Sequence, residues 1–245
     1  MRFVDSHLHP DGPGGANLLA TARANQTLLF VCGTDRETST AALRLANESP
    51  ETVRAFVGMH PSGATKAGSM SWLPKALEGA SGLGEVGLDP KYSATGQESA
   101  QMKVLLAQLE SAQRLSRPVQ IHSRDAERLC LDTLGSFSLK RVLMHWFQAE
   151  ERLAEVLARG YFVSFGPATI YSKKLQRMAA MCDPSQALTE TDAPTPFKPL
   201  GGVQGVSLIP SVVFRLAEVW GMGFEDARAA LQENAMSFLG PHGKG

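Results

Sequence analysis

Eight short apolar runs alternate with helical segments along this chain, and this alternation limits the fold more than any other feature. Each run is almost continuously apolar until its C-terminal end, which is typical of a parallel strand buried on both faces. Eight strands alternating with helices predict an α/β fold of the (β/α)8 TIM-barrel type. The runs are RFVD, TLLFVCG, VRAFVGMH, GLGEVGLD, PVQIHS, RVLMHW, YFVSFG and ALTETD, at residues 2–5, 27–33, 53–60, 82–89, 118–123, 141–146, 161–166 and 187–192.

Helical segments fill the intervals between the runs. In residues 97–117, Leu105, Leu109 and Ala112 share one helical face, as in a helix that packs against a sheet. The same reasoning predicts helices at residues 16–25, 36–48, 69–80, 124–134, 149–160, 171–181, 207–220 and about 225–239.

No low-complexity stretch or linker divides the sequence, so we expect a single domain over residues 1–245. The Pro- and Gly-rich stretch 191–205 is expected to be a long loop after the last strand. The alternative fold is an open doubly wound sheet. It is disfavoured because Asp89 and Pro90 come directly after GLGEVGL, where the start of a helix would be expected.

Charge and cysteine content restrict the setting in which the protein works. Lys and Arg total 24, as do Asp and Glu, so no global basic field favours nonspecific binding to nucleic acid, although a local patch remains open. The three cysteines are far apart and odd in number, which indicates a reducing compartment. With no signal pattern and no apolar run of membrane-spanning length, we expect a cytoplasmic protein without a membrane partner, and we favour a monomer.

Histidines and carboxylates gather at the C-terminal ends of the predicted strands, where a barrel of this type carries its active site. His7 and His9 are two residues apart, so in a strand they point to the same face. Five of the six histidines occupy strand ends, and His242 is the exception. The strand-end residues are His7, His9, His60, His122, His145, Glu85, Asp89, Glu190 and Asp192.

Imidazoles and carboxylates in this arrangement are ligands for divalent metal ions. Two ions about 3.5–4 Å apart activate water and stabilise both the attacking and the leaving oxygen of a hydrolysis. Asp192 and Glu85 are therefore the predicted catalytic residues, and Asp192 can also accept the proton of the water. Glu85 is predicted to bridge a first site of His7, His9, Glu85 and Asp192 and a second site of Glu85, His122 and His145.

Several single residues have two interpretations. Glu190 is either a partner that orients a ligating histidine or part of an ion pair in the barrel core. Asp89 either orients a ligand or caps the turn before Pro90. Trp146 either stacks on a base or sugar or packs in the core. Any one histidine could also be a hydrogen-bonded structural residue.

The motifs DSHLH, GMHP, GEVGLD, PVQIHSRDA, MHWF and TETDAP occur in an order that resembles the TatD family of metal-dependent deoxyribonucleases, over residues 5–194. The resemblance implies a TIM barrel of the metallo-dependent hydrolase type. It places His60 and Arg124 where they could bind a substrate phosphate, while the alternative for Arg124 is an ion pair with Asp125 or another neighbour. It also implies two divalent ions (Mg, Mn or Zn) held by His7, His9, Glu85, His122, His145 and Asp192.

The expected function is that of a divalent-metal-dependent hydrolase, a deoxyribonuclease or phosphodiesterase that cleaves DNA ends with a metal-activated water. Three loops differ from the residues usual in the family, which keeps open a hydrolase of the same fold that acts on a small phosphoester, amide or lactone. A noncatalytic metal-binding barrel is the third hypothesis, and the complete ligand set argues against it. The differing residues are Pro90, Gln148, Ala149, Leu208 and Ile209.

Overall fold

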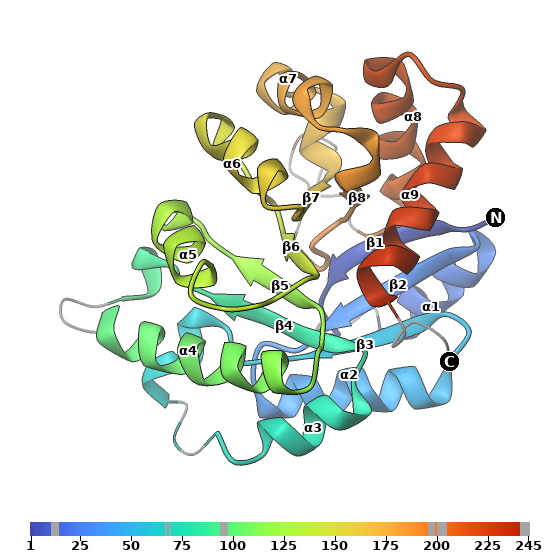
Figure 1. Cartoon of the computed structure of the whole chain (residues 1–245). Coiled ribbons are helices and arrows are strands. Elements are labelled where there is room, and N and C mark those ends of the chain that lie inside the picture. Colours follow the sequence, from blue (N-terminus) through green and yellow to red (C-terminus); the bar gives the residue numbers. More distant parts are fainter. Residues whose placement is uncertain are drawn as a thin grey trace.

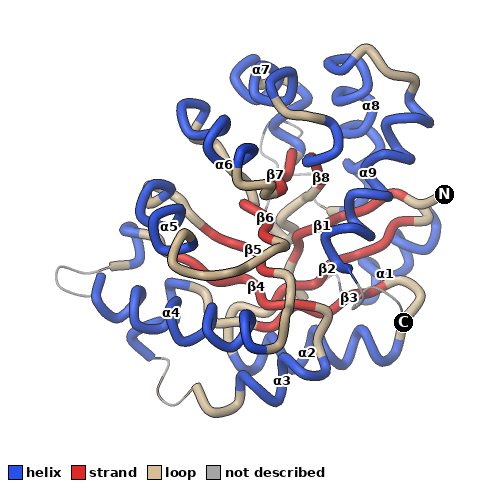
Figure 2. Tube along the Cα trace, in the orientation of Figure 1, coloured by secondary structure: helices blue, strands red, loops and turns tan. Residues whose placement is uncertain are grey.

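The computed structural model describes residues 1–10, 15–66, 68, 70–93, 98–195, 199 and 205–240. Eight parallel strands form one sheet that curls into a nearly closed barrel, and helices cover its outer face (Figures 1 and 2). Strand neighbours follow the chain order from first to last, as in a (β/α)8 barrel. The predicted fold is confirmed, and the doubly wound alternative is excluded because its strand order is not sequential.

A strand forms at every predicted apolar run. Most strands end before the run does, since the polar residues at the end of the run already belong to the loop that leaves the barrel. The first strand instead continues to Leu8, so that His7 lies within it and His9 follows it. The strands are β1 (Phe3–Leu8), β2 (Thr27–Cys32), β3 (Val53–Val57), β4 (Gly82–Gly87), β5 (Val119–His122), β6 (Val142–Met144), β7 (Phe162–Phe165) and β8 (Ala187–Thr189).

The predicted helices are present, with shifts at their ends. A capping box begins the second one, where Oδ1 of Asp35 accepts a hydrogen bond from the backbone nitrogen of Thr38 at 2.8 Å. The segment predicted at 124–134 becomes helical only at Glu127, because residues 124–126 form a turn. The α-helices are α1 (Gly15–Ala24), α2 (Arg36–Glu48), α3 (Leu73–Gly79), α4 (Glu98–Arg114), α5 (Glu127–Leu134), α6 (Leu153–Ala158), α7 (Lys173–Met181), α8 (Ile209–Trp220) and α9 (Phe224–Leu239).

The described residues leave out most of the predicted loop 191–205 and the whole tail that carries His242.

The seam between β8 and β1 is joined by backbone hydrogen bonds just beyond the strands. The nitrogen of Asp192 donates to the carbonyl of His7 at 2.9 Å, and the nitrogen of His9 donates to the carbonyl of Ala193 at 2.7 Å. This seam brings the first and last strand ends together, so residues from opposite ends of the chain share one site.

Helix α9 crosses the N-terminal end of the barrel (Figure 1). Nδ2 of Asn234 donates to the carbonyls of Pro184 and Ala187, at 2.6 and 2.9 Å, next to the start of β8. Because this end is covered by a helix, the opposite end of the barrel is the one left for a site.

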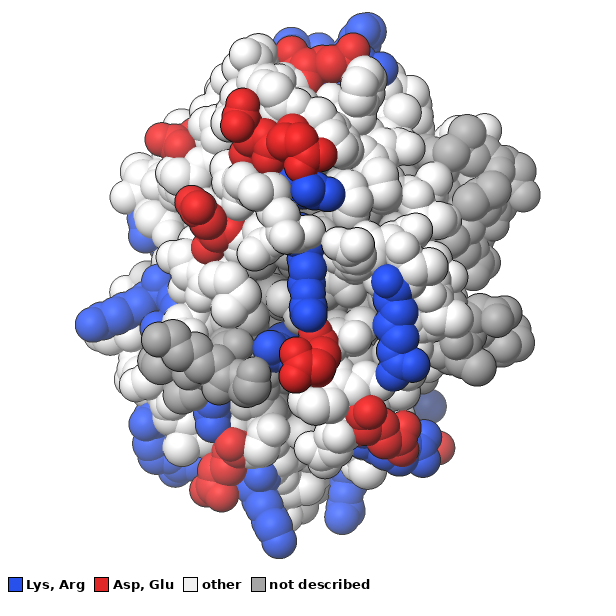
Figure 3. Space-filling model, turned by 90° about the vertical axis from the view of Figure 1, so that its right-hand side faces the viewer, with Lys and Arg blue, Asp and Glu red and all other residues white. Residues whose placement is uncertain are grey.

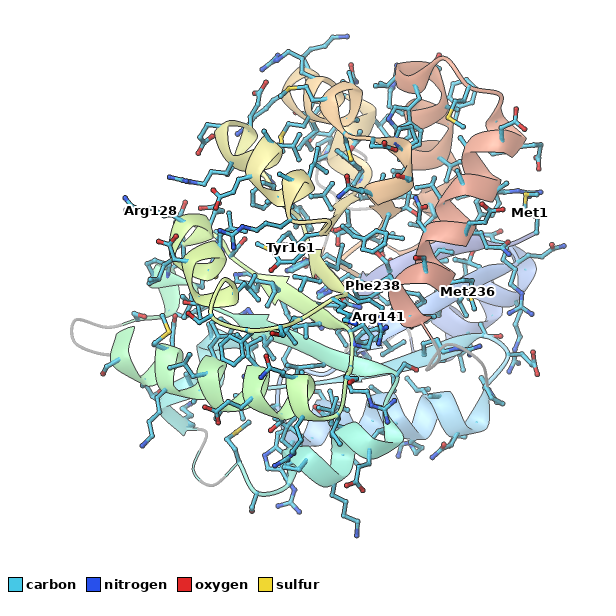
Figure 4. The ribbon with its side chains drawn as sticks, viewed as in Figure 1. Met1, Arg128, Arg141, Tyr161, Met236 and Phe238 are labelled. Carbon is cyan, nitrogen blue, oxygen red and sulfur yellow. The ribbon has the colours of Figure 1, made fainter. Side chains whose placement is uncertain are left out.

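Phe238, near the end of α9 and labelled in Figure 4, plugs one end of the barrel by packing between aromatic side chains of β2, β3 and β7. Phe238 is fully buried. The centroid of its ring lies 5.9 Å from that of Phe56, 6.3 Å from that of Phe30 and 5.7 Å from that of Phe162. Buried aromatic clusters of this kind contribute both apolar area and ring–ring contacts.

Phe238→Ala is therefore expected to lower the free energy of unfolding by about 3–5 kcal/mol, as for other fully buried Phe-to-Ala changes. Urea denaturation followed by circular dichroism measures this. Phe214, whose residue is 54% exposed, supplies the control, and Phe214→Ala should change stability by only about 0.5 kcal/mol. Equal losses in the two variants would contradict the role of Phe238 as a plug.

Charges of both signs are interspersed on the face shown in Figure 3, as expected from a formal net charge of zero. Among the described residues, no single helix is both long and apolar enough to cross a membrane. A stretch of sufficient length and apolarity arises only when Val206–Trp220 and Phe224–Leu239 are taken together, and these are bent by 107° at their junction.

Candidate metal centre

The C-terminal ends of five strands bring the predicted ligands together at the open end of the barrel. Because all strands are parallel, polar residues at their ends converge on one point. The contributing positions are His7 in β1, His9 after β1, Glu85 in β4, His122 at the end of β5, His145 after β6 and Asp192 after β8.

The first group of ligand atoms lies at the β8–β1 seam. Nε2 of His9 is 3.2 Å from Oδ1 of Asp192 and 3.5 Å from Oε2 of Glu85. Nε2 of His7 lies 3.6 and 3.8 Å from the same two oxygens. Four side chains thus turn one atom each toward a common centre.

The second group surrounds the other oxygen of Glu85. Its Oε1 is 2.7 Å from Nδ1 of His122 and 2.8 Å from Nε2 of His145, and these two nitrogens are 3.2 Å apart. That spacing suits two ligands of one tetrahedral ion. Nε2 of His60 lies 3.7 Å from the same oxygen, so this side chain also borders the second group. Glu85 therefore presents a different oxygen to each group.

The Nδ1 atoms of His7 and His9 point away from the cluster, and each contacts a hydrogen-bond acceptor. Nδ1 of His7 is 2.6 Å from Oε1 of Gln120, and Nδ1 of His9 is 2.9 Å from the carbonyl of Cys32. An acceptor on Nδ1 fixes the tautomer that leaves the Nε2 lone pair free for a metal ion.

A buried nitrogen without a hydrogen-bond partner indicates that the cluster suits a metal ion. Within the described part of the chain, Nε2 of His7 is buried and has no hydrogen-bond partner. A buried polar nitrogen without a partner is costly, and a cation would satisfy it. Ligand atoms within 4.8 Å of one another form three groups that could hold an ion: His7, Glu85 and His145; His7, His9 and Asp192; and His60, Glu85 and His122.

Asp89 performs both of the tasks considered for it. Its Oδ2 is 2.7 Å from Nε2 of His122, while its Oδ1 accepts a hydrogen bond from the nitrogen of Lys91 at 2.9 Å and so caps the turn. Arg124 adds an ion pair at 2.7 Å from the same Oδ2, so its partner is Asp89 and not Asp125. The guanidinium nevertheless lies in the wall of the pocket, and its side chain is 41% exposed.

Glu190 is fully buried and lies behind His145. Its Oε2 is 3.5 Å from Nδ1 of His145, an ion-pair distance without a hydrogen bond. The same carboxylate accepts hydrogen bonds from the nitrogen of Trp146 at 2.8 Å and from Oγ of Ser164 at 2.7 Å. Glu190 therefore fixes the start of the loop that follows β6.

Both carboxylates of the cluster favour their charged forms. Burial opposes the ionisation of Glu85, but His145 and His60 outweigh it and hold the pKa of this carboxyl well below its ordinary value. Burial likewise opposes the ionisation of Asp192, but the neighbouring His9 and His7 outweigh it and hold the pKa of this carboxyl below its ordinary value. Ionised oxygens are the form that ligates cations.

Three glutamines that sequence reasoning missed support the site. Gln120 lies in β5 two residues before His122, and its position in an otherwise apolar strand is the one signal that could have revealed it. Oε1 of Gln101 accepts from the nitrogen of Asp89 at 2.9 Å, and its Nε2 donates to the carbonyl of Asp89 at 2.9 Å. Gln108 makes the equivalent pair with Met59, at 2.7 and 3.1 Å, just before His60. Helix α4 thus fixes two site loops.

Unusual backbone conformations accompany the strand ends. Trp146 and Asp192 have φ values of +43° and +53°, which residues other than glycine seldom adopt. Gly87 has a φ of +153°, and a β-carbon there would lie 1.8 Å from the carbonyl oxygen of His122. The close approach of β4 and β5 that places His122 beside Glu85 therefore requires glycine.

A cavity of about 680 Å³ opens above the cluster. Its walls include Trp146, which is half-buried, and the exposed Gln148, one of the residues in the three loops that differ from the family's usual sequence. Among the other residues of those loops, Pro90 begins a short 3-10 turn, η2 (Pro90–Tyr92), and Leu208 is buried.

The fold and the site together define a barrel of the metallo-dependent hydrolase type. Residues 4–240 match the family model described as TatD related DNase, so the chain belongs to the TatD family.

Known proteins with similar sequences carry both nuclease and hydrolase names. The chain is 33% identical to Deoxyribonuclease TATDN3 of Homo sapiens over 165 residues, which are 64% of this chain and 59% of that protein. The matched stretch therefore spans only a little over half the length of the human relative. The chain is also 29% identical to the uncharacterized metal-dependent hydrolase YabD of Bacillus subtilis over 218 residues, which cover 84% of this chain and 85% of YabD.

Among solved structures, the fold is similar to that of YJJV, a TatD homologue from Escherichia coli k12. The TM-score is 0.86 at 27% identity, and the alignment covers 97% of each chain.

Proposed function

We propose that this chain is a divalent-metal-dependent phosphodiesterase, a deoxyribonuclease that cleaves at the ends of DNA. The observation that carries the proposal is the position of Glu85, whose Oε2 faces His7 and His9 while its Oε1 faces His122 and His145. A carboxylate shared in this way is suited to bridge two ions. The nuclease name of the human relative supports the choice of substrate.

The proposed cofactor is a pair of divalent ions, Mg, Mn or Zn. When bound, such ions polarise phosphoryl oxygens and lower the pKa of water. The proposed ligands are those predicted from the sequence, namely His7, His9, Glu85, His122, His145 and Asp192, and His60 lies close enough to join the second group.

Asp192 is the proposed general base. Its Oδ1 faces the histidines, its Oδ2 accepts a hydrogen bond from Oγ1 of Thr195 at 3.1 Å, and its side chain is 17% exposed in the wall of the cavity. A water that attacks the phosphorus atom can pass its proton to this carboxylate as the bond to the leaving nucleotide oxygen breaks.

The substrate phosphates are proposed to contact the opposite wall of the cavity, where Arg124, Lys91 and His60 lie. Arginine offers a fork of donors that matches phosphate oxygens. The ion pair between Arg124 and Asp89 holds the guanidinium in place before the substrate binds.

We further propose that residues 1–245 act as one domain, as a cytoplasmic monomer. The buried free thiols of Cys32, Cys130 and Cys182 fit a reducing compartment.

The test is the release of nucleotides from end-labelled single-stranded DNA by the purified protein, first stripped with a chelator and then supplied with Mn²⁺ or Mg²⁺. Removal of metal is expected to lower the rate at least about 100-fold, and added metal should restore it, because the ions supply several kcal/mol of charge stabilisation.

A panel of small phosphoesters, amides and lactones is tested in parallel. Metal-dependent turnover of one of these, without nucleotide release, would favour the small-substrate hydrolase instead. Bound metal without turnover on any substrate would favour the noncatalytic barrel.

A further inference from the structure

One aromatic side chain in the cavity wall has no part in the chemistry described so far. Of the large hydrophobic side chains that are exposed among the described residues, only Tyr92 lines this cavity, and it is 47% exposed. An exposed ring inside a polar cavity is a ready surface for an apolar or aromatic part of a ligand.

The backbone holds Tyr92 firmly at this place. Pro90 begins the turn η2, Asp89 caps it, and the nitrogen of Tyr92 donates to the carbonyl of Asp89 at 3.1 Å. Because Asp89 also contacts His122, the turn that carries the ring is tied directly to the candidate metal centre.

The ring also adjoins the cluster through its side-chain contacts. The edge of His60 meets it at a centroid distance of 5.4 Å and an interplanar angle of 76°, and Nε2 of His60 lies 3.7 Å from Glu85. Tyr92 thus lies directly beside a side chain that adjoins the candidate metal centre.

Cationic side chains stand beside the ring. Cζ of Arg124 is 5.2 Å from the ring centroid, and Lys91, the residue before Tyr92, is 61% exposed at its side chain and paired with Asp125 at 3.8 Å. An aromatic ring next to positive charges is the combination that binds unpaired nucleotides, because it offers a stacking face and contacts to phosphate.

We infer that Tyr92 stacks on the base of the nucleotide next to the scissile phosphate and thereby determines substrate specificity. This inference rests on the proposed nuclease function and adds to it a favourable contact with the base. Tyr92 touches no reacting atom, so it contributes to substrate binding rather than to the chemical step.

The experiment compares wild type, Tyr92→Ala and Tyr92→Phe on two end-labelled DNA strands. The strands are identical except that one has abasic sites at its last two nucleotides. On the intact strand, Tyr92→Ala should lower kcat/KM by about 5- to 100-fold, mainly through KM, while Tyr92→Phe stays within about twofold, because stacking needs the ring and not the hydroxyl. On the abasic strand, all three proteins should have equal kcat/KM.

Tyr171, which is 54% exposed and does not line the cavity, provides the matched control, and Tyr171→Ala should behave as wild type on both strands. A loss that is equal on the two strands would overturn the inference, because Tyr92 would then act through His60 or Arg124 rather than on a base. A Tyr92→Ala variant as active as wild type on intact DNA would overturn it as well. If wild type releases nucleotides from neither strand, the proposed function itself fails.

Discussion

The Glu85→Gln variant is expected to lose its bound metal and its activity together. Oε1 and Oε2 of Glu85 face the two groups of histidines separately, so a single amide substitution weakens both sites. The neutral amide also removes the negative charge that lies 2.8 Å from His145 and 2.7 Å from His122. Activity should fall at least about 10³-fold, since the ions supply several kcal/mol of stabilisation.

Metal content by elemental analysis and nucleotide release under saturating Mn²⁺ measure the two effects in one preparation. Glu127→Gln is the matched control, because Glu127 lines the same cavity and has no ion pair with the histidines among the described residues. The Glu127→Gln variant should retain its metal. A Glu85→Gln variant that keeps both ions and full activity would rule out the shared carboxylate.

The sequence predicted which side chains converge at the open end of the barrel because the histidines mark the ends of apolar runs. His122 and His145 each follow a buried stretch, and parallel strands bring such ends together whatever the loops do. Glu85 could be placed for the same reason, within a run that is apolar or glycine on either side.

The supporting contacts could not be predicted, because they join elements distant in the sequence. Gln108 reaches Met59 across 49 positions, and nothing in the local sequence shows which distant backbone its amide will contact. The plug made by Phe238 depends on how α9 crosses the barrel, which local pattern does not determine.

The position of Asp192 could be predicted only in part. Its place near the last strand was predicted, but β8 ends at Thr189, and the chain then turns with a φ of +53° at Asp192. The hydrogen bond from its nitrogen to His7 aims the carboxylate at His9, and this bond exists only because β8 meets β1.

The Asp192→Asn variant should separate chemistry from metal binding. Asp192 contacts His7 and His9 but none of the histidines around Oε1 of Glu85, so at least one ion should remain bound. An amide cannot accept the proton of the attacking water, and kcat should fall about 10²- to 10⁴-fold, the usual contribution of a general base.

The measurement is kcat for nucleotide release together with the number of ions bound per chain. Asp183→Asn supplies the control, because Asp183 caps a distant turn through Oδ1 and asparagine can do the same, so wild-type activity is expected. Full activity of Asp192→Asn would remove Asp192 from the mechanism and leave its contact with His9 as a structural one. Loss of both ions would instead mean that the first group holds the second in place, which the separate oxygens of Glu85 argue against.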